Sequence, residues 1–386
     1  MSCDRQIWNA VEKILASNTH LSCAITGGGS TLINWLFNHP GASRVLIEAQ
    51  IPYSSRALEK FLCKPGPHPV VANTARDMAF FAHARTTDLV GHNIDTVGFA
   101  LSAALATSRA RKGSDRAYVA SLRDNVCRVG SINFSAKKKD RSEQEVLLSN
   151  FGLSHLADTY GFDFDPNLPD WVEVDLDVID LNDPLSAFFE GKIDILEMGN
   201  DGKFSTIVRD CPRVIFPGSF NPLHQGHVDL AKTVEKLSGR EVTLELSIQN
   251  VDKPEMTLSD IQERLEDIRG HFPVILTRCP RFFDKARFFV APHFVVGYDT
   301  AARLVDAKYY QNGKTGMESS LQELIGAQTI IWVAGRVVNG QFKTFHDLSI
   351  PSELDRLFRP INQEQFRSDV SSTEIRSKKP ILERLR

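Results

Sequence analysis

The sequence predicts an α/β fold with two domains, and three observations carry this prediction. The chain has 386 residues, the length of two or three typical domains. From residue 213 onward, short apolar runs alternate with amphipathic stretches, which is typical of a parallel sheet covered by helices. Near the N-terminus, an apolar strand over 21–25 runs into three glycines and then into a helix over 31–37.

Composition excludes several classes of protein. A hydrophobic content of 42% indicates a globular chain, and a net charge of -3 gives no reason to expect nucleic acid or an anionic membrane as a partner. The six cysteines form no CxxC pair, so neither a zinc site nor a disulfide framework is predicted. With no signal-peptide core and no apolar run that could span a bilayer, we expect a cytoplasmic protein. Nuclear and organellar locations stay open.

The first predicted domain covers residues 1–160. Its further helices are expected at 7–15, 72–87 and 141–160, and its further strands at 45–49, 96–101 and 116–120. The glycine turn between 21–25 and 31–37 is Thr26-Gly-Gly-Gly-Ser30. Consecutive glycines can present backbone N–H groups to an anion, but a tight turn needs the same residues, so both readings stay open.

Five short motifs follow one another in this domain. They are Thr26-Gly-Gly28, Pro40-Gly-Ala-Ser43, Pro52-Tyr-Ser54, Val97-Gly-Phe-Ala100 and Arg116-Ala-Tyr-Val-Ala120. Together they resemble the CinA C-terminal family over roughly residues 5–160. Members of that family include nicotinamide-nucleotide amidases, so the resemblance implies an α/β domain of amidase-like fold.

The residues needed for amidase chemistry differ from the family pattern. The nucleophilic serine of the family falls on Ala24, its glutamate on Cys23 and its lysine on Leu58, and a glycine loop of the family falls on residues 102–107. An alanine cannot attack an amide, and a leucine cannot relay a proton. We therefore expect a domain that has lost this chemistry, with Cys23 a small buried thiol rather than a substitute nucleophile. Nucleotide binding or dimerisation is consistent with the remaining glycines, so a homo-oligomer is left open.

Residues 161–211 are predicted to connect the domains as a small β-rich segment. Residues 171–179 alternate apolar and acidic side chains, as a half-buried strand does. The acidic side chains then share one solvated face and are not expected to bind metal. Residues 194–198 and 203–208 flank a turn rich in Gly and Asn, which predicts a β-hairpin.

The second predicted domain, 212–386, contains the chain's main functional motif. A strand over 214–216 breaks at a Pro-Gly pair, passes through a polar loop and reaches a helix over 228–237. In an open α/β sheet such a loop lies at the carboxyl end of its strand, beside a helix N-terminus, where phosphates bind. Further strands are expected at 242–247, 274–277, 294–297 and 330–334, and a further helix at 258–270.

Four polar segments follow predicted strands or begin predicted helices, and they are 218–227, 249–253, 297–303 and 371–376. A helix N-terminus combined with hydroxyl groups and a guanidinium such as that of Arg376 makes a strong phosphate site. His224 and His227 could also bind a metal. Zinc would need further ligands that the neighbouring sequence does not supply, so no metal site is predicted here.

Two of these segments resemble the nucleotidyltransferase superfamily with the HxGH signature. Residues 218–227 contain that signature in full, and 371–376 are similar to its second motif, Ser-Ser/Thr-x-x-Arg/Lys. Within the superfamily, 218–222, 294–300 and 308–310 look most like nicotinamide or nicotinate mononucleotide adenylyltransferases. Pantetheine-phosphate and cytidylyl transferases share the loop, so the acceptor stays open. The resemblance implies a Rossmann-like fold over roughly 213–386.

The family reaction is attack by a phosphate monoester on the α-phosphorus of a nucleoside triphosphate. The nucleophile is already anionic near neutral pH, so positioning and charge neutralisation are needed rather than a general base. By resemblance, His224 and His227 donate hydrogen bonds to the triphosphate, and Gly226 allows close approach. The catalytic Arg376 and the nearby hydroxyl groups are expected to hold the β- and γ-phosphates, and these hydroxyl groups belong to Ser371, Ser372 and Thr373.

Further nucleotide-binding roles are carried over from the resemblance to Gly218, Ser219, Phe220, Lys253 and Asp299. The first three would line the mononucleotide and adenosine, Lys253 would neutralise phosphate, and Asp299 would face the nucleosides. Lys253 adjoins an aspartate and could equally be a solvated loop residue. Mg²⁺ is expected as cofactor, bound mainly through the nucleotide phosphates, so no cage of protein ligands is needed.

The sequence thus predicts an adenylyltransferase that joins ATP to nicotinamide or nicotinate mononucleotide, giving NAD or its deamido form and pyrophosphate. One alternative is a nucleotidyltransferase for another phosphorylated acceptor, and a second is a non-catalytic nucleotide-binding scaffold. A third is a working amidase in the N-terminal half.

Overall fold

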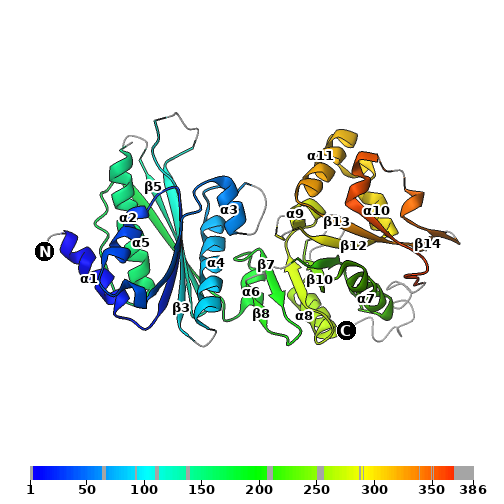
Figure 1. Ribbon diagram of the computed structural model, residues 1–386, viewed down its shortest axis with the longest axis horizontal. Helices are drawn as coiled ribbons and strands as arrows, with labels where there is room; N and C mark the ends of the chain where they lie inside the picture. Colours follow the sequence, from blue (N-terminus) through cyan, green and yellow to red (C-terminus); the bar gives the residue numbers. More distant parts are fainter. Residues whose placement is uncertain are drawn as a thin grey trace. The chain divides into compact units, whose positions relative to one another are not determined.

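The computed structural model divides the chain into two compact units, Met1–Ala187 and Phe188–Arg386. Each unit is an α/β structure with its own sheet (Figure 1), as predicted. The structure describes residues 3–62, 67–91, 94–108, 113–135, 140–206, 212–249, 256–286, 288–289, 291–338, 340–348, 350 and 352–368. Within these ranges, no helix has the length and apolar character needed to cross a membrane.

The first unit contains a six-stranded sheet in the order β2-β1-β3-β4-β5-β6. The strands are β1 (His20–Thr26), β2 (Leu46–Gln50), β3 (Thr96–Ala104), β4 (Arg116–Arg123), β5 (Val126–Phe134) and β6 (Val172–Asp180). β1 runs parallel to β2 and β3, whereas the later strands pair antiparallel. β5 was not predicted, although Asp124 and Asn125 both have positive φ, as the tight turn between two hairpin strands requires.

Helices cover both faces of this sheet (Figure 1). One face carries α1 (Cys3–Leu15), α2 (Ser30–Asn38) and α5 (Arg141–Thr159), and the other carries α4 (Ala72–Val90). The shorter elements are η1 (Ala42–Arg44), α3 (Ser55–Phe61) and α6 (Pro184–Phe189). α4 lies so close to β3 that a Cβ on Gly98 would be 2.1 Å from the carbonyl oxygen of Ala79. A glycine is therefore needed at this crossing.

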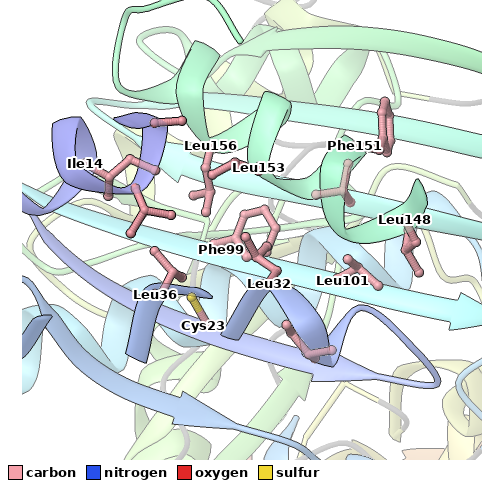
Figure 2. Close-up of a cluster of buried hydrophobic side chains, with 14 of the residues drawn as sticks. Ile14, Cys23, Leu32, Leu36, Phe99, Leu101, Leu148, Phe151, Leu153 and Leu156 are labelled. Atoms are coloured by element: carbon pink, nitrogen blue, oxygen red, sulfur yellow. The ribbon is translucent and has the colours of Figure 1, made fainter. Parts of the chain in front are cut away.

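The core of the first unit lies between the sheet and the α1, α2 and α5 layer. Figure 2 shows Leu32 and Leu36 of α2 facing Leu153 and Leu156 of α5 across Phe99 of β3. All five side chains are fully buried. Removing a large buried side chain of this kind typically costs about 2–5 kcal/mol, so this layer is a major source of stability.

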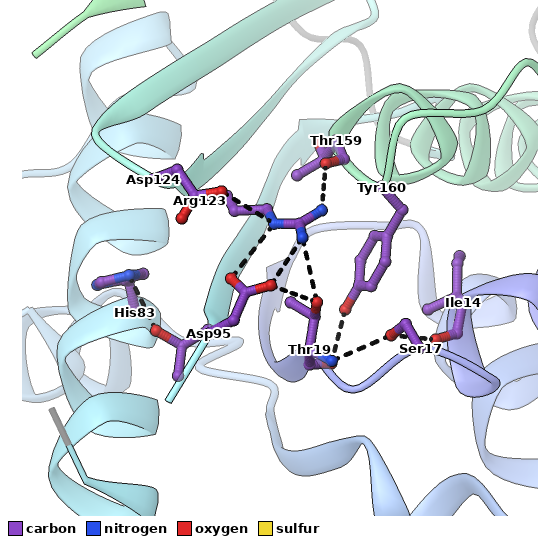
Figure 3. A network of polar contacts seen from close by, with 10 residues as sticks. Ile14, Ser17, Thr19, His83, Asp95, Arg123, Asp124, Thr159 and Tyr160 are labelled. Atoms are coloured by element: carbon purple, nitrogen blue, oxygen red, sulfur yellow. Dashed lines mark hydrogen bonds and ion pairs between the residues drawn. The ribbon is translucent and has the colours of Figure 1, made fainter. Parts of the chain in front are cut away.

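A polar network lies at the amino ends of β1 and β3 in the first unit (Figure 3). Arg123 of β4 donates to both carboxylate oxygens of Asp95, at 2.7 and 3.3 Å, and to the carbonyl oxygen of Thr159. Thr19 donates to Asp95, and the hydroxyl of Tyr160 donates to the Thr19 carbonyl oxygen. The network ties the start of β3, the end of β4 and the end of α5 together.

The second unit contains an eight-stranded sheet in the order β16-β13-β12-β9-β10-β11-β7-β8. The six strands from β16 to β11 are parallel, while β7 and β8 add an antiparallel hairpin. The strands are β7 (Ile195–Met198), β8 (Phe204–Ser205), β9 (Val214–Pro217), β10 (Val242–Ser247), β11 (Val274–Thr277), β12 (His293–Gly297), β13 (Ile330–Ala334) and β16 (Phe358–Ile361). β14 (Arg336–Val338) and β15 (Gln341–Lys343) form a separate hairpin.

The helices of the second unit are α7 (Gln225–Ser238), α8 (Leu258–Ile268), α9 (Phe282–Ala286), α10 (Tyr298–Leu304) and α11 (Gly313–Gly326). Its short helical turns are η2 (Ala307–Tyr309), η3 (Phe345–Asp347) and η4 (Ser352–Leu357). α7 packs on β9 and β10, while α9 and α11 share the opposite core with Phe294 and Ile331. Parallel strands with helices on both faces match the Rossmann-like fold that was predicted.

The predicted connecting segment, 161–211, is divided between the two units. β6 pairs with β5 in the first sheet, and β7 pairs with β11 in the second. The predicted hairpin is present as β7 and β8. The predicted strand over 171–179 is present as β6, but the expectation that one of its faces is buried is wrong, because Val174, Leu176 and Val178 are exposed on this edge strand.

Candidate active site

The loop after β9 is shaped by a buried aromatic ring. Phe220 is 1% exposed, and its ring packs edge-on against Phe216 and His227 at centroid distances of 5.4 and 5.0 Å. A Cβ on Gly218 would lie 2.6 Å from this ring, so glycine is needed there. Of the residues predicted to line a nucleotide, Ser219 is exposed at the loop surface, whereas the Phe220 ring supports the loop from inside.

His224 and His227 lie together at the start of α7. Their rings stack with centroids 3.7 Å apart, and the backbone N–H of His224 donates to Nδ1 of His227 across 3.3 Å. A neutral imidazole whose Nδ1 accepts a hydrogen bond carries its proton on Nε2. His227 is thereby oriented with Nε2–H as a donor.

Burial keeps these histidines uncharged. Desolvation, with a smaller effect from the neighbouring His224, lowers the pKa of His227 from 6.5 to about 4. Burial also lowers the pKa of His224. At neutral pH the pair therefore consists of two neutral rings, each of which has one N–H group that can donate a hydrogen bond to a phosphate oxygen.

Gly226 lies between the two histidines in a tight space. A Cβ at this position would be 2.6 Å from the Oγ of Ser368 and 3.2 Å from Nδ1 and Cε1 of His224. A side chain here would push directly on the histidine ring. The structure brings Ser368 to the HxGH turn from the segment after β16, and no sequence motif had singled out this residue.

Asp299 lies at the carboxyl end of β12, which is the neighbour of β9 in the sheet. It is half-exposed and forms an ion pair with Arg336, the first residue of β14. Sequence reasoning missed Arg336, although it follows a buried parallel strand as the other candidate segments do. The ends of β9, β12 and β13 thus contribute His224, Asp299 and Arg336 to one edge of the sheet.

The remaining predicted members fall outside the described residues, and they are Lys253, Ser371, Ser372, Thr373 and Arg376. Their roles stay predictions. Among the residues that are described, no group of three or more His, Cys, Asp or Glu side chains could hold a metal ion. Mg²⁺ held mainly through nucleotide phosphates therefore stays an expectation.

A cavity of about 770 Å³ opens in the helix layer of the second unit. Its walls come from α9, α10, η2 and α11 and combine aromatic rings, guanidinium groups and hydroxyl groups. Representative lining residues are Arg281, Phe282, Thr300, Arg303, Tyr309 and Ser319. The Arg303 guanidinium lies 5.8 Å from the centre of the Tyr309 ring, and such a pair can hold a flat or anionic group.

A buried ion pair joins one wall of this cavity to the sheet. Nζ of Lys285 in α9 lies 2.6 Å from Oε2 of Glu245 in β10, and both side chains are buried. Thr277 of β11 donates to the other carboxylate oxygen at 2.5 Å. The backbone carbonyl of Glu245 also accepts from the N–H of Gly218, so this residue contacts both the cavity wall and the HxGH loop.

In the first unit, the glycine turn binds the side-chain carboxylate of Glu145. The Glu145 carboxylate of α5 accepts from the backbone N–H of Gly29 at 2.8 Å and of Thr31 at 3.2 Å. The hydroxyl of Ser30 donates to it at 3.0 Å. The N–H groups of this turn therefore bind a carboxylate of the same chain. This carboxylate caps the N-terminus of α2 and fastens α5 to it.

The positions aligned above with the family's serine and glutamate, Ala24 and Cys23, are both buried. Ala24 is fully buried and Cys23 is 2% exposed, packed near Leu36 and Phe99 (Figure 2). Burial raises the pKa of the Cys23 thiol well above its usual range. Because the thiolate is the nucleophilic form of cysteine, Cys23 has the environment of a structural residue.

A family model matches most of the second unit, including its strand, loop and helix. Residues 215–378 match the family model described as Cytidylyltransferase-like, which places this unit in the HxGH superfamily that was predicted.

Solved structures of CinA proteins are also similar to this chain. The CinA superfamily protein from Escherichia coli is 14% identical, with 41% of this chain and 94% of that chain covered and a TM-score of 0.33. The competence or damage-inducible protein from Enterobacter asburiae is 16% identical, with 40% and 98% covered and a TM-score of 0.33. The competence/damage inducible protein CihA from Agrobacterium tumefaciens is 16% identical, with 40% and 94% covered and a TM-score of 0.32. No curated protein matches the sequence.

Proposed function

We propose that the second unit transfers the adenylyl group of ATP to nicotinamide or nicotinate mononucleotide, releasing pyrophosphate. The observation that carries the proposal is the pair of stacked, neutral histidines at the start of α7, with Nε2–H of His227 oriented as a donor. The substrate assignment rests on the sequence resemblance of 218–222 and 294–300 to adenylyltransferases of this type.

For this reaction the protein has to position the two substrates and to stabilise the negative charge on their phosphate oxygens. A phosphate oxygen of the mononucleotide attacks the α-phosphorus of ATP, a new P–O bond forms, and the bond to pyrophosphate breaks. Negative charge on the phosphate oxygens is then stabilised by donors that are already oriented. His224, His227 and the N-terminus of α7 supply these donors, while Arg376 would hold the leaving pyrophosphate and Mg²⁺ would neutralise charge.

The cavity between α9, α10 and α11 suits the acceptor. Its aromatic walls at Phe282 and Tyr309 could contact a pyridine ring, and its hydroxyl groups could bind a ribose. Arg281 lies 4.4 Å from the centre of the Phe283 ring and forms an ion pair with Asp284, which holds its guanidinium in the wall. A pocket of this size and chemistry favours a mononucleotide over a purely aliphatic acceptor.

We propose further that the first unit does not hydrolyse nicotinamide mononucleotide. An alanine occupies the nucleophile position, and the thiol of the adjacent Cys23 is buried and protonated. Ammonia release from nicotinamide mononucleotide by the full chain would contradict this part of the proposal.

The test is a matrix of donors and acceptors with pyrophosphate release as the readout. ATP and CTP are each combined with nicotinamide mononucleotide, nicotinate mononucleotide and pantetheine phosphate. CTP is included because the matching family model is described as Cytidylyltransferase-like. We expect turnover with ATP and a pyridine mononucleotide. Turnover confined to another pair would overturn the proposed donor and acceptor. ATP binding without pyrophosphate release in any pair would favour a non-catalytic nucleotide-binding scaffold.

A further inference from the structure

The outer edge of β6 combines an edge strand with a row of exposed apolar side chains. This nine-residue strand ends the first sheet, and within the described residues no strand pairs with its outer side. Long edge strands present unpaired backbone N–H and C=O groups, and natural proteins usually shorten, twist or cover them. β6 is paired along its whole length with β5, so its backbone is held in an extended form that another strand could join.

The two faces of β6 differ in chemistry. Val174, Leu176 and Val178 point to one face, and they are 47%, 65% and 57% exposed. Leu176 lies opposite Gly130, which has no side chain to cover it. Large apolar side chains exposed in a row are a common sign of an interaction site.

The other face of β6 carries Glu173, Asp175 and Asp177, all of them exposed. Among the described residues, no ion pair engages these three carboxylates. A strand that docks here would meet a row of negative charge on one face and a row of apolar side chains on the other. Its own side chains must therefore alternate between basic and apolar.

This pattern argues against a second copy of the chain as the occupant. Two β6 strands related by a twofold axis form an antiparallel pair in which the acidic faces coincide. Carboxylates on the two copies would then face one another at Cβ separations of about 4.5–5.5 Å, and like charges at that distance destabilise a strand pair.

We propose that the outer edge of β6 is a docking site for an extended segment of another protein that alternates lysine or arginine with apolar residues. The segment adds as a seventh strand through backbone hydrogen bonds. Its basic side chains lie over Glu173, Asp175 and Asp177, and its apolar side chains lie beside Val174, Leu176 and Val178.

The test measures fluorescence anisotropy of labelled octapeptides with the full chain at 150 mM salt, where long-range attraction between exposed charges is screened. An alternating Lys/Val peptide is compared with an alternating Glu/Val peptide. We expect the first to bind at least tenfold more tightly. In the variant that combines Asp175→Lys with Asp177→Lys, we expect this preference to reverse. Both changes are at exposed positions, and an unchanged Tm checks that the variant is folded.

A Lys/Val peptide that is N-methylated at alternate residues separates strand addition from simple charge attraction. It keeps every charge but cannot donate along one edge, so we expect its binding to be lost. Equal binding of the methylated peptide, or no binding of any peptide, would overturn the proposal. Self-association that Leu176→Lys abolishes, measured by sedimentation, would assign the edge to a second copy instead.

Discussion

Lys285 and Glu245 form a 2.6 Å ion pair that is sealed from solvent, and this pair fixes α9 to the strand beside the HxGH loop. Removing one partner leaves the other charge buried without compensation, which typically costs about 3–5 kcal/mol. We therefore expect Lys285→Met to lower the free energy of unfolding in urea by about that amount.

The matched control for this change is Lys343→Met. Lys343 pairs with Asp347 at 3.2 Å, but both side chains are about one-third exposed. Pairs at the surface typically contribute up to about 1 kcal/mol, so the control should stay close to the wild type. Equal losses in the two variants would show that the buried pair has no special role.

Gly226→Ala should slow the reaction without unfolding the protein. The new methyl group would lie 2.6 Å from the Oγ of Ser368 and crowd the ring of His224. Displacing a donor by about an ångström can cost about a hundredfold in rate, and we expect kcat to fall toward that range. Gly326→Ala, at a position with open space around it, is the control and should leave kcat unchanged. A Gly226→Ala enzyme with normal kcat would show that the space around His224 is not needed.

The partly buried His227 should make the folded state sensitive to mild acid. Its pKa is about 4 in the folded protein against 6.5 ordinarily, so the unfolded chain takes up the proton first as pH falls. This contribution to stability is complete above pH 6.5 and is lost between pH 6.5 and 4. We expect the Tm of His227→Gln to fall less steeply across that range than the Tm of the wild type. Parallel curves would contradict the lowered pKa.

The network at Asp95 should protect the first unit in a different pH range. Burial alone would raise the pKa of Asp95, but hydrogen bonds from Arg123 and Thr19 outweigh it and lower the pKa below 3.8. The resulting stabilisation is present above pH 3.8 and is lost as pH falls through the folded pKa. We expect Asp95→Asn to lower Tm at pH 7 and the difference to shrink below pH 3.8.

Asp124→Asn is the control for this network, because Asp124 also lies near Arg123, at 3.4 Å, but is 75% exposed. Its replacement should change Tm little at any pH. If both variants lose the same stability at pH 7, the hydrogen bonds that Asp95 accepts from Arg123 and Thr19 add nothing specific.

The parallel part of the fold was predictable because buried strands such as β9 and β13 are continuous apolar runs. β5 was missed because its residues alternate less regularly, and the signal lay in the turn at Asp124 and Asn125. The exposure of β6 could not be predicted, since alternation shows two faces but not whether a helix covers either of them.

The candidate site was partly predictable for a similar reason. The carboxyl ends of parallel strands meet at one edge, so His224 and Asp299 could be grouped from the sequence. The sequence did not show that Glu145 would occupy the glycine turn, because that contact joins residues more than a hundred positions apart. The cavity at Thr300 depends on how α9, α10 and α11 pack, and no local pattern encodes it.

Dinucleotide formation from ATP and nicotinamide mononucleotide tests most directly whether the HxGH turn transfers the adenylyl group. The product is quantified by chromatography for the wild type, for His227→Ala and for the control His293→Gln, whose ring lies at the opposite end of the sheet. We predict NAD formation by the wild type and the control, and a loss of about a hundredfold or more in kcat for His227→Ala. Full activity of His227→Ala, or no dinucleotide from the wild type, would contradict adenylyl transfer at the HxGH turn.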